Sequence, residues 1–437
     1  ASRPRSWSWM ALLLGLAVAL GGCSDDDDDP TSPPPADRTF TVTLTNVSPR
    51  YEHFASGVFD TPEGASEPGP IGPEQMYEVR FGAARGDRLT FAAMMVQSND
   101  LFYGTPVDGI DLYPDGVALS GEITDQIVLW DAGTEFNQEP GVGEDQAPRQ
   151  AAPGAGADDV DPAVRPVDDV YTYPAVNEVL TVRVFAEGEG EFTLRLENVS
   201  DASTLQPSVG PSLPVPVSPG VYLVHQDPEP LFDPGLAEPG EGLESLAEDG
   251  DPTALAATLA ARSGLEAVFS PGVFAVHDTG RPLFSRDGNI PVALEPLAED
   301  GDPALLFQYA AELATVSHAG VFSTPLGQSN PGPLVPGASY RLAFEASPGD
   351  RLSFATMLVE SNDLFYAFDP VGQELFTDDG SPRTGDLSDA VTLWDAGTEV
   401  NQWPGAGPDQ GARQPVPGAG DPDPDTELRP VDDGYAY

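Results

Sequence analysis

The chain has 437 residues, enough for two or three domains, and a formal net charge of −52 from 71 Asp and Glu against 19 basic residues, all Arg. So acidic a surface repels nucleic acid and anionic lipid, which argues against both as partners, and it attracts cations such as calcium. Acidity also serves solubility alone, for example in a saline habitat, and composition does not separate these interpretations. The 47 Pro and 46 Gly favour short strands joined by turns over long helices.

The first 23 residues are typical of a targeting segment. Arg3 and Arg5 give it a positive start, and residues 10–20 form an apolar run of 11 residues, shorter than the about 20 needed to span a bilayer. The run leads into a Leu-Gly-Gly-Cys motif ending at Cys23, which resembles the lipobox of bacterial lipoproteins. That resemblance implies cleavage before Cys23 and acylation of this residue, which would anchor the protein in a lipid bilayer. Ser24 follows, which resembles the signal for an outer-membrane destination in a bacterial envelope.

Residues 24–36 predict an extended tether, because five consecutive aspartates repel one another and the prolines after them favour polyproline II. A first domain is expected at residues 37–200. Segments that alternate apolar and polar residues there are predicted strands: residues 39–47, 77–81, 89–96, 127–130, 179–185 and 192–196. Turn-forming residues separate them and no convincing amphipathic helix intervenes, which predicts an all-β fold, an antiparallel β-sandwich. Residues 140–166 are expected to form an extended surface loop.

The second domain, expected at residues 201–437, repeats most of the first. Two stretches run in parallel, residues 57–169 and 320–433. The second copy stops at Tyr437 with no counterpart of residues 174–200. We therefore expect the second domain either to be incomplete or to be closed by residues 192–198, since an open sheet exposes unpaired backbone.

A smaller tandem repeat lies within the second domain, at residues 218–303. Ser-Pro-Gly-Val and Leu-Ala-Glu-Asp-Gly-Asp each occur twice in it. Each copy is followed by a short helical candidate, residues 253–262 or 304–315. The second domain is thus predicted to carry short helices that the first lacks.

Two strand-end motifs recur in both domains, Ser-Asn-Asp and Trp-Asp-Ala-Gly-Thr-Glu. They supply carboxylate and amide oxygens, which suit calcium because this ion takes about six to eight oxygen ligands at flexible geometry. Gly133 permits a tight turn that lets Asp131 and Glu135 face one point. The candidates are Asn99, Asp100, Asp131, Glu135 and Asn137, then Asn362, Asp363, Asp395, Glu399 and Asn401. Such residues also cap turns by accepting backbone amides, and the spacing leaves this alternative open.

The motifs SNDLFYG and LWDAGTE, with SPGVFAVH and LAEDGD of the small repeat, resemble the spondin domain, the N-terminal module of F-spondin and mindin. The resemblance covers most of the chain after Cys23. It implies two β-sandwich domains that bind calcium through acidic loops and act in extracellular adhesion or recognition. The metal ligands that it implies are Asp100, Asp131, Glu135, Asp363, Asp395 and Glu399. Asn99 stands where the family has Pro, Leu101 where it has Trp and Glu135 where it has Asp, and the family's disulfide cysteines are absent.

Catalytic signatures are weak. His225 and His277 occupy equivalent places in the small repeat, but no His-Glu-x-x-His spacing accompanies them, and we interpret both as structural. No G-x-S-x-G, P-loop or G-x-G-x-x-G precedes a helix. Paired acids leave a carbohydrate-active enzyme as the weakest hypothesis, with Trp130 and Trp394 as its candidate sugar platforms.

The favoured hypothesis is a non-enzymatic, lipid-anchored cell-surface protein that binds calcium and recognises an unknown extracellular protein or glycan. An acidic structural spacer of the cell envelope is the second hypothesis. Binding of a specific ligand would distinguish these two hypotheses, because a structural spacer needs no ligand.

Lipidation of Cys23 predicts a mature chain that starts at this residue and carries acyl groups. Intact mass spectrometry of protein extracted from membranes should show that start together with the added lipid mass. An unmodified chain that begins upstream of Cys23, or a freely secreted product, would contradict the prediction.

Overall fold

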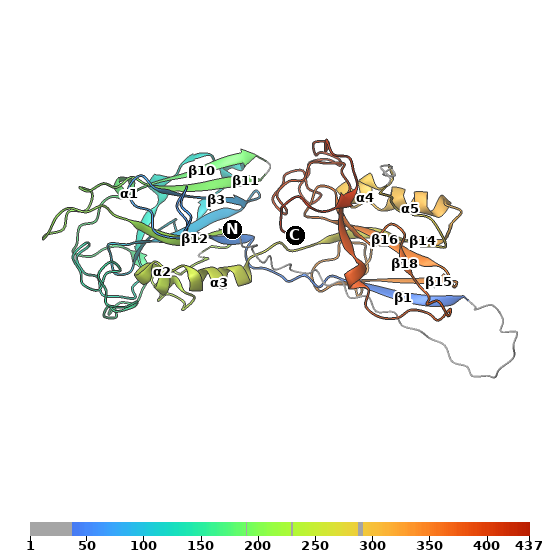
Figure 1. The fold of residues 1–437 in the computed structure, drawn as a ribbon, viewed down its shortest axis with the longest axis horizontal. Helices are drawn as coiled ribbons and strands as arrows, with labels where there is room; N and C mark the ends of the chain where they lie inside the picture. The colour runs from blue at the N-terminus through green and yellow to red at the C-terminus, as the bar shows by residue number, and fades with distance from the viewer. Residues whose placement is uncertain (1–36, 189, 229, 287–291) are drawn as a thin grey trace, which may run out of the picture. The chain divides into compact units, whose positions relative to one another are not determined.

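The computed structural model describes residues 37–437 except 189, 229 and 287–291, and the chain consists mainly of antiparallel strands with a few short helices (Figure 1). The predicted all-β class is confirmed. The signal peptide, Cys23 and the tether at residues 24–36 lie outside the described residues. No helix in the described part of the chain is both long and apolar enough to cross a membrane.

The chain divides into two compact units. One, here called the central unit, is Tyr51–Leu265, and the other, here called the split unit, joins residues 37–50 to Glu266–Tyr437. The sequence-predicted boundary at Ser200 is therefore not where the structure divides. The cause lies in the strand pairing, because the first strand of the chain belongs to the split unit and residues 201–265 complete the central unit.

The central unit is a sandwich of two antiparallel sheets. The smaller sheet has the order β3-β11-β10-β7, with strands β3 (Met76–Gly82), β11 (Glu191–Asn198), β10 (Leu180–Gly188) and β7 (Gly121–Glu122). The larger sheet has the order β2-β12-β4-β5-β8-β9, with β6 paired to β4. Its strands are β2 (Ala55–Phe59), β12 (Val217–His225), β4 (Arg88–Met95), β5 (Leu101–Gly104), β8 (Val128–Asp131), β9 (Arg165–Pro166) and β6 (Ile110–Asp111).

Two apolar cores stabilise the central unit. Between the sheets, Tyr103 of the larger sheet packs in one cluster with Val182 of the smaller one. On the other face of the larger sheet, Phe102 packs in a second cluster with Leu246 of α2. Phe102 and Tyr103 are adjacent on β5, so they serve opposite faces, as the period of a strand requires. The helices are α1 (Val176–Val179), α2 (Leu243–Asp249) and α3 (Thr253–Arg262), with short 3-10 turns at Pro114–Gly116 and Thr124–Gln126.

The split unit repeats this plan with fewer strands. β1 (Arg38–Thr45) pairs with β15 (Ser339–Ala346), and the larger sheet has the order β14-β13-β16-β17-β19-β20, with β18 paired to β16. Its strands are β13 (Phe269–His277), β14 (Val316–Phe322), β16 (Arg351–Leu358), β17 (Leu364–Ala367), β18 (Gln373–Glu374), β19 (Thr392–Asp395) and β20 (Arg429–Pro430). Its helices are α4 (Glu295–Asp300) and α5 (Ala304–Glu312), with a 3-10 turn at Ser388–Ala390.

The repeated Ser-Pro-Gly-Val segment lies on β12 and β13, inside the two larger sheets. Gly220 of β12 is so close to its neighbours that a Cβ atom would come within 2.2 Å of the Ala92 carbonyl oxygen and 2.5 Å of the Phe59 ring. Gly272 of β13 has the corresponding close neighbours. Each larger sheet therefore contains its own copy of the motif, which explains the small tandem repeat.

Strand β1 takes in the split unit the place that β11 has in the central unit. Asn46, just after β1, donates from Nδ2 to the carbonyl oxygens of Ala267 (2.7 Å) and Leu334 (2.9 Å). Asn198, at the end of β11, makes the same two bonds within the central unit, at 2.8 and 2.9 Å. The alternative that residues 192–198 close the second domain is therefore wrong, because β11 stays in the central unit and β1 pairs with β15.

The six predicted strands are all present, with ends that differ by one to three residues. The helix predicted at residues 253–262 is α3, and the one predicted at 304–315 ends earlier, at Glu312. The short helices α2 and α4 were not predicted, since each spans fewer than two turns and ends at a glycine in the left-handed region, Gly250 or Gly301. Of the predicted loop at residues 140–166, residues 140–164 form a turn-rich loop and residues 165–166 form β9. The loop is not wholly on the surface, because Gln146 is fully buried.

The central unit should fold alone. A fragment of residues 51–265 contains every strand of both its sheets, so we expect one cooperative unfolding transition in urea, followed by circular dichroism and Trp fluorescence. A fragment of residues 37–200 should lack such a transition, because it loses β12 from between β2 and β4 and the helices that cover the sheet. Equal transitions for both fragments would contradict this assignment of strands.

The two asparagines provide a matched pair of variants. Asn46→Ala removes two buried hydrogen bonds from Nδ2 and the side-chain acceptor of the Ser48 N–H, and it should destabilise the split unit by about 1–3 kcal/mol. Asn198→Ala removes the equivalent bonds and should destabilise the central unit by a similar amount. Hydrogen exchange resolved by peptide reports each unit separately. The exposed Asn330→Ala should change neither unit. If Asn46→Ala loosened the central unit instead, β1 would belong there.

Candidate functional site

Two clusters of carboxylates, one in each unit, contain the six predicted ligands. In the central unit, Asp100 directly precedes β5 and Asp131 ends β8, and these strands are neighbours, with Leu101 opposite Asp131. Glu135 follows shortly after β8. The three side chains are almost fully buried, with residue exposures of 0, 1 and 3 %. The structure thus brings together the residues that the sequence placed at neighbouring strand ends.

The Trp-Asp-Ala-Gly-Thr-Glu motif folds as a turn against Asp100. Oδ1 of Asp131 accepts the N–H of Gly133 at 2.7 Å. Gly133 has a φ of +69°, and a Cβ there would come within 2.8 Å of backbone atoms, so only glycine fits. The turn directs the N–H groups of Thr134 and Glu135 to Oδ2 of Asp100, at 2.7 and 3.0 Å. Turn capping is therefore the role of these two oxygens.

One carboxylate oxygen in each cluster has no partner. Oδ1 of Asp100 is buried without a hydrogen bond among the described residues, and so is Oδ1 of its counterpart Asp363. A buried polar atom in this state is uncommon, because its lost hydration is not compensated. The same atom is unpartnered among the described residues of both units, so the unpartnered oxygen is a repeated feature of the site.

The predicted amides orient the carboxylates. Asn99 donates from Nδ2 to Oε2 of Glu135 (3.2 Å), and Asn137 donates from Nδ2 to Oδ2 of Asp131 (2.8 Å). The other oxygen of Glu135 accepts the N–H of Gly156 at 2.7 Å. Asn99 and Asn137 thus act here as hydrogen-bond donors, and the expectation that they offer oxygen ligands does not describe these contacts.

Glu248 of α2 is a fourth buried carboxylate of the central cluster, and sequence reasoning did not single it out. Burial raises its pKa to about 7, the charges of Glu135 and Asp100 act in the same direction, and a hydrogen bond with Thr134 opposes them. Its counterpart is Glu299 of α4, also buried. The available signal was the repeated Leu-Ala-Glu-Asp-Gly-Asp segment, in which this glutamate occurs both times.

The remaining residues of that segment form the turn between α2 and α3. Gly250, with φ +67°, ends α2, and Oδ1 of Asp251 accepts the N–H of Thr253 at 2.9 Å where α3 begins. Oδ1 of Asp249 accepts a hydrogen bond from Nε2 of Gln150 at 2.8 Å, which holds the loop after β8 against the helix. Each polar residue of the segment therefore has a distinct structural role.

Arg165 on β9 is a second residue that was missed. Its Nη2 lies 2.9 Å from Oδ2 of Asp131 and 2.8 Å from Oδ2 of Asp159. Arg429 makes the equivalent pair of contacts with Asp395 and Asp423, at 2.8 and 3.0 Å. Both arginines belong to the Arg-Pro-Val-Asp-Asp segment at the end of the repeat, so each cluster contains one permanent positive charge.

Burial is the main influence on the pKa values of the central carboxylates. It raises the pKa of Asp100 to about 7, and the charge of Asp131 adds to this effect. Burial also raises the pKa of Asp131, although the Arg165 guanidinium opposes it, and raises the pKa of Glu135. At neutral pH the cluster therefore holds carboxylates that are costly to ionise.

The cluster of the split unit repeats these contacts. Asp363 accepts the backbone N–H groups of Thr398 and Glu399, at 2.7 and 3.1 Å. Asp395 accepts the backbone N–H of Gly397 at 2.7 Å and a hydrogen bond from Nδ2 of Asn401 at 3.0 Å. Glu399 accepts a hydrogen bond from Nδ2 of Asn362 at 3.5 Å and the backbone N–H of Gly420 at 2.9 Å. Burial raises the pKa of Asp395 to about 6 and those of Glu399 and Glu299 to about 7. The two units therefore contain the same site.

The described residues contain no set of three or more His, Cys, Asp or Glu side chains arranged to hold a metal ion. Several of the carboxylate oxygens accept hydrogen bonds from the protein instead, and Asp131 is also paired with Arg165. The unpartnered oxygens of Asp100 and Asp363 are what the site still offers to a cation.

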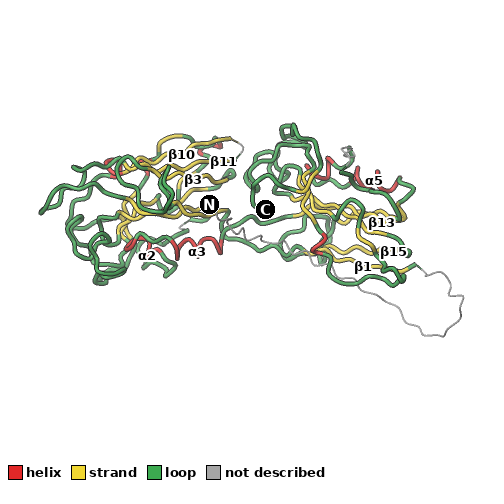
Figure 2. Tube along the Cα trace, in the orientation of Figure 1, coloured by secondary structure: helices red, strands yellow, loops and turns green. Residues whose placement is uncertain are grey.

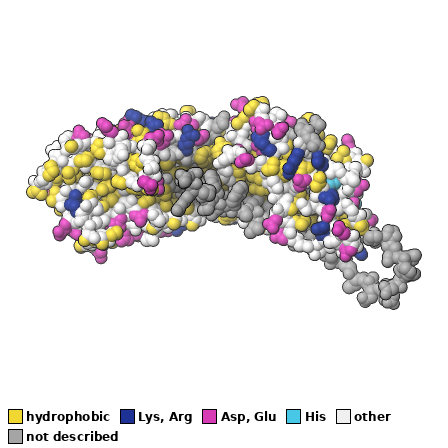
Figure 3. Space-filling model, viewed as in Figure 1, with side chains coloured by type: hydrophobic (Ala, Val, Ile, Leu, Met, Phe, Trp, Pro, Cys, Tyr) yellow, Lys and Arg dark blue, Asp and Glu magenta, His cyan; other side chains and the backbone are white. Residues whose placement is uncertain are grey.

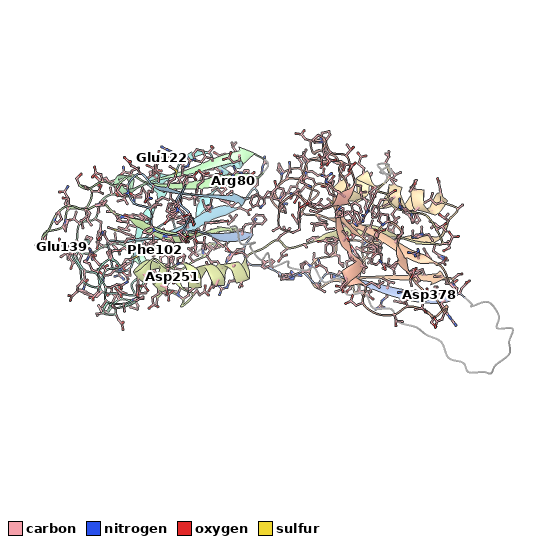
Figure 4. All side chains as sticks on the ribbon, in the orientation of Figure 1. Arg80, Phe102, Glu122, Glu139, Asp251 and Asp378 are labelled. Atoms are coloured by element: carbon pink, nitrogen blue, oxygen red, sulfur yellow. The ribbon has the colours of Figure 1, made fainter. Side chains whose placement is uncertain are left out.

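The other candidates from the sequence have structural surroundings. His225 contacts Thr90 Oγ1 through Nε2 (2.8 Å) and the Asp227 carbonyl oxygen through Nδ1 (2.7 Å), and burial lowers its pKa to about 4. Trp130 is buried, with its ring centroid 4.9 Å from that of Phe232. Phe102, labelled in Figure 4, packs in the same core. These contacts fit the structural interpretation of the histidines and place Trp130 away from the surface.

Acidic side chains are spread over the visible surface, with arginines among them, rather than gathered into one patch (Figure 3). Burial, and not a local concentration of surface charge, thus distinguishes the carboxylate clusters from the other acidic residues. No protein-family model matches the chain, and no curated protein matches it.

The raised pKa values predict a pH dependence of stability. A folded pKa of about 7 for Asp100 and Glu248 lies above the unfolded values, near 4, so the folded state binds more protons between these limits. The stabilisation is complete below about pH 4 and is lost as the pH rises through about 7. In chelator, the free energy of unfolding should therefore fall from pH 5 to pH 8.

The variant Asp100→Asn with Asp363→Asn should flatten this dependence, whereas the exposed Asp108→Asn should not. The control matters because general repulsion among surface carboxylates would give the same trend in all variants. Urea unfolding at each pH provides the measurement, and a wild-type stability that rises from pH 5 to pH 8 would contradict the prediction.

Proposed function

We propose that the protein is a spondin-like recognition module of a bacterial cell surface, anchored through Cys23 and stabilised by calcium in both units. The observation that carries the calcium part of this proposal is the unpartnered, buried Oδ1 of Asp100, repeated at Asp363. The lipid anchor and the adhesive role rest on the lipobox and on the motifs that resemble spondin domains.

The residues of the cluster fit calcium in their chemistry. Asp100 would hold the ion through Oδ1. Asp131, Glu135 and Glu248 would supply further oxygens after the loop moves them toward the ion, because these side chains are not arranged around one ion in the described residues. A bound cation would favour the ionised forms that burial disfavours, so calcium should bind as these groups lose protons. Arg165 competes with the ion for Asp131, which favours modest affinity.

Recognition is supported by the arrangement of the site within each unit. Both clusters lie where the strands of the larger sheet meet long loops, residues 132–164 and 396–428. Hydrogen bonds from these loops to Glu135 and Glu399 connect the loop conformation to the carboxylates. A cation at this position would order the loops, and ordered loops on a rigid sheet are common binding surfaces.

The carbohydrate-active alternative is disfavoured by burial. Asp131 and Glu135 are almost fully buried and accept hydrogen bonds from the protein, whereas glycoside hydrolysis needs two acids on either side of a bound sugar. Trp130 and Trp394 lie in apolar cores. The acidic spacer of the envelope remains the second candidate, supported by the net charge of −52.

Calcium should raise the melting temperature of the full chain at pH 8 relative to chelator. Extracellular modules commonly bind calcium with dissociation constants of roughly 10⁻⁴ to 10⁻³ M, so about 2 mM calcium should stabilise each unit by about 0.6–1.8 kcal/mol. Magnesium should do less, because it demands octahedral geometry and releases water reluctantly. Asp100→Asn should remove the response of the central unit alone, and Asp100→Asn with Asp363→Asn should remove it from both, with Asp108→Asn as the unaffected control.

Identical melting curves in calcium and in chelator would leave the clusters as turn caps. Independently of the melting curves, a glycan array and a whole-cell binding assay, each run with and without calcium, distinguish a recognition module from a spacer. A recognition module should bind a defined target, more strongly in calcium, and a spacer should bind nothing.

A further inference from the structure

A Pro-Gly-Ala-Gly segment occurs once beside each carboxylate cluster, at residues 153–156 in the central unit and at residues 417–420 in the split unit. Each copy lies in the long loop that follows β8 or β19. In the central unit residues 151–155 are exposed, and Gly156 is half-buried. Figure 2 shows loops, drawn in green, next to α2, and a hydrogen bond from Gly154 to the last residue of this helix places the segment there.

The backbone of the segment lies directly on two buried glutamates of the central unit. A Cβ atom on Gly156 would come within 2.6 Å of Oε1 of Glu135, which is too short for a contact between nonbonded atoms. A Cβ atom on Gly154 would lie 3.5 Å from Oε2 of Glu248, at ordinary contact distance. Glu135 and Glu248 are 3 and 5 % exposed, so on this side the exposed segment separates them from solvent.

The split unit repeats this arrangement. A Cβ atom on Gly420 would come within 2.8 Å of Oε1 of Glu399, and one on Gly418 would lie 3.5 Å from Oε2 of Glu299. Both copies have the same spacing, with one alanine between the two glycines. The close approach of the backbone to the carboxylates therefore explains the glycines of both segments.

The chain is fixed at both ends of this part of the loop. In the central unit, Nε2 of Gln150 donates to Oδ1 of Asp249 at 2.8 Å, and the carbonyl oxygen of Ala157 accepts the N–H of Phe136 at 2.7 Å. The split unit has the corresponding bonds, at 2.9 and 2.8 Å. Residues 151–156 can thus move while both ends stay in place.

Two described hydrogen bonds hold residues 151–156 between these ends. The N–H of Gly156 donates to Oε1 of Glu135 at 2.7 Å, and that of Gly154 donates to Oδ1 of Asp249 at 3.3 Å. The six residues are Ala, Ala, Pro, Gly, Ala and Gly, so lifting them uncovers little apolar surface. Segments with so few contacts open locally at a small fraction of the free energy of global unfolding.

The oxygen that would hold a cation belongs to the same buried cluster. Asp100 is fully buried, and its Oδ1 has no hydrogen bond among the described residues. A hydrated ion from solvent therefore reaches this oxygen only after part of the cover of the cluster moves aside. Residues 151–156 are an exposed and weakly attached part of that cover.

We propose, on the basis of the calcium binding proposed above, that residues 151–156 form a lid over the cluster of the central unit and that residues 415–420 form an equivalent lid in the split unit. Each lid lifts to let calcium exchange with solvent and closes again over the bound ion. The lids thereby set the rates of calcium binding and release, whereas the carboxylates set the affinity.

Stopped-flow kinetics of calcium binding to the full chain, and of calcium release into a fluorescent chelator, test this role. The association rate of the wild-type chain should reach a plateau as the calcium concentration rises, because lid opening then limits the rate. Gly156→Ala should accelerate both association and release at the central site by at least about tenfold, because the added methyl group meets the Glu135 carboxylate and prevents closure. Gly420→Ala should do the same at the site of the split unit.

A matched control and a second measurement complete the test. Gly69→Ala should change neither rate, because a Cβ atom there meets no atom within 4 Å. Hydrogen exchange of the wild-type chain needs no variant to fold. Calcium should slow exchange of the amides of Gly154 and Gly156 by at least about fivefold, because the ion favours the closed lid and exchange requires the open one.

Two results would overturn the lids while calcium binding stands. One is Gly156→Ala and Gly420→Ala chains whose release accelerates without faster association, because the glycine N–H groups would then only orient the glutamates. The other is exchange at Gly154 and Gly156 that calcium does not slow. A wild-type chain that binds no calcium in isothermal titration calorimetry would instead refute the proposed function, and the lids with it.

Discussion

The pairing of β1 with β15 determines which residues form each unit. Because β1 occupies in the split unit the position of β11, the chain leaves that unit after residue 50 and returns to it at Glu266, and the central unit is completed by its own β11 and β12. The contacts that stabilise the split unit therefore join residues almost 300 positions apart, such as Asn46 and Leu334. Pairing at this separation carries a large loop-closure entropy, so the split unit should depend on prior folding of the central unit.

Burying carboxylates removes their hydration, and this is the second constraint on the structure. Hydrogen bonds from backbone N–H groups compensate for the lost hydration, together with the charge of an arginine. The glycine turn after Asp131 directs two amides to one oxygen of Asp100, and Arg165 neutralises Asp131 from the side. Such hydrogen bonds favour the charged form, yet burial outweighs them and the pKa of Asp100 is raised to about 7. The remaining oxygen has no donor among the described residues, so proton uptake, or the cation proposed above, would lower the free-energy cost of burying this carboxylate.

The strands, the class of fold and the convergence of Asp100, Asp131 and Glu135 could be predicted, because period-two alternation and strand-end motifs are local signals. The domain boundary could not, since β1 and β11 carry nearly the same sequence, FTVTLTNVS and FTLRLENVS, and local pattern does not say which sheet each one joins. Glu248 and Arg165 were missed for a related reason. They reach the cluster from α2 and β9, and only the tertiary fold brings those elements to β5 and β8.

Internal duplication accounts for both the redundancy and the asymmetry of the molecule. Each larger sheet has its own helices, its own glycine contact and its own carboxylate cluster, so the duplication repeats the whole site. The smaller sheets are not preserved equally, because β10 has no counterpart among the described strands of the split unit. The larger sheets therefore suffice to position the carboxylate clusters, since both clusters are present although the smaller sheets differ in their described strands.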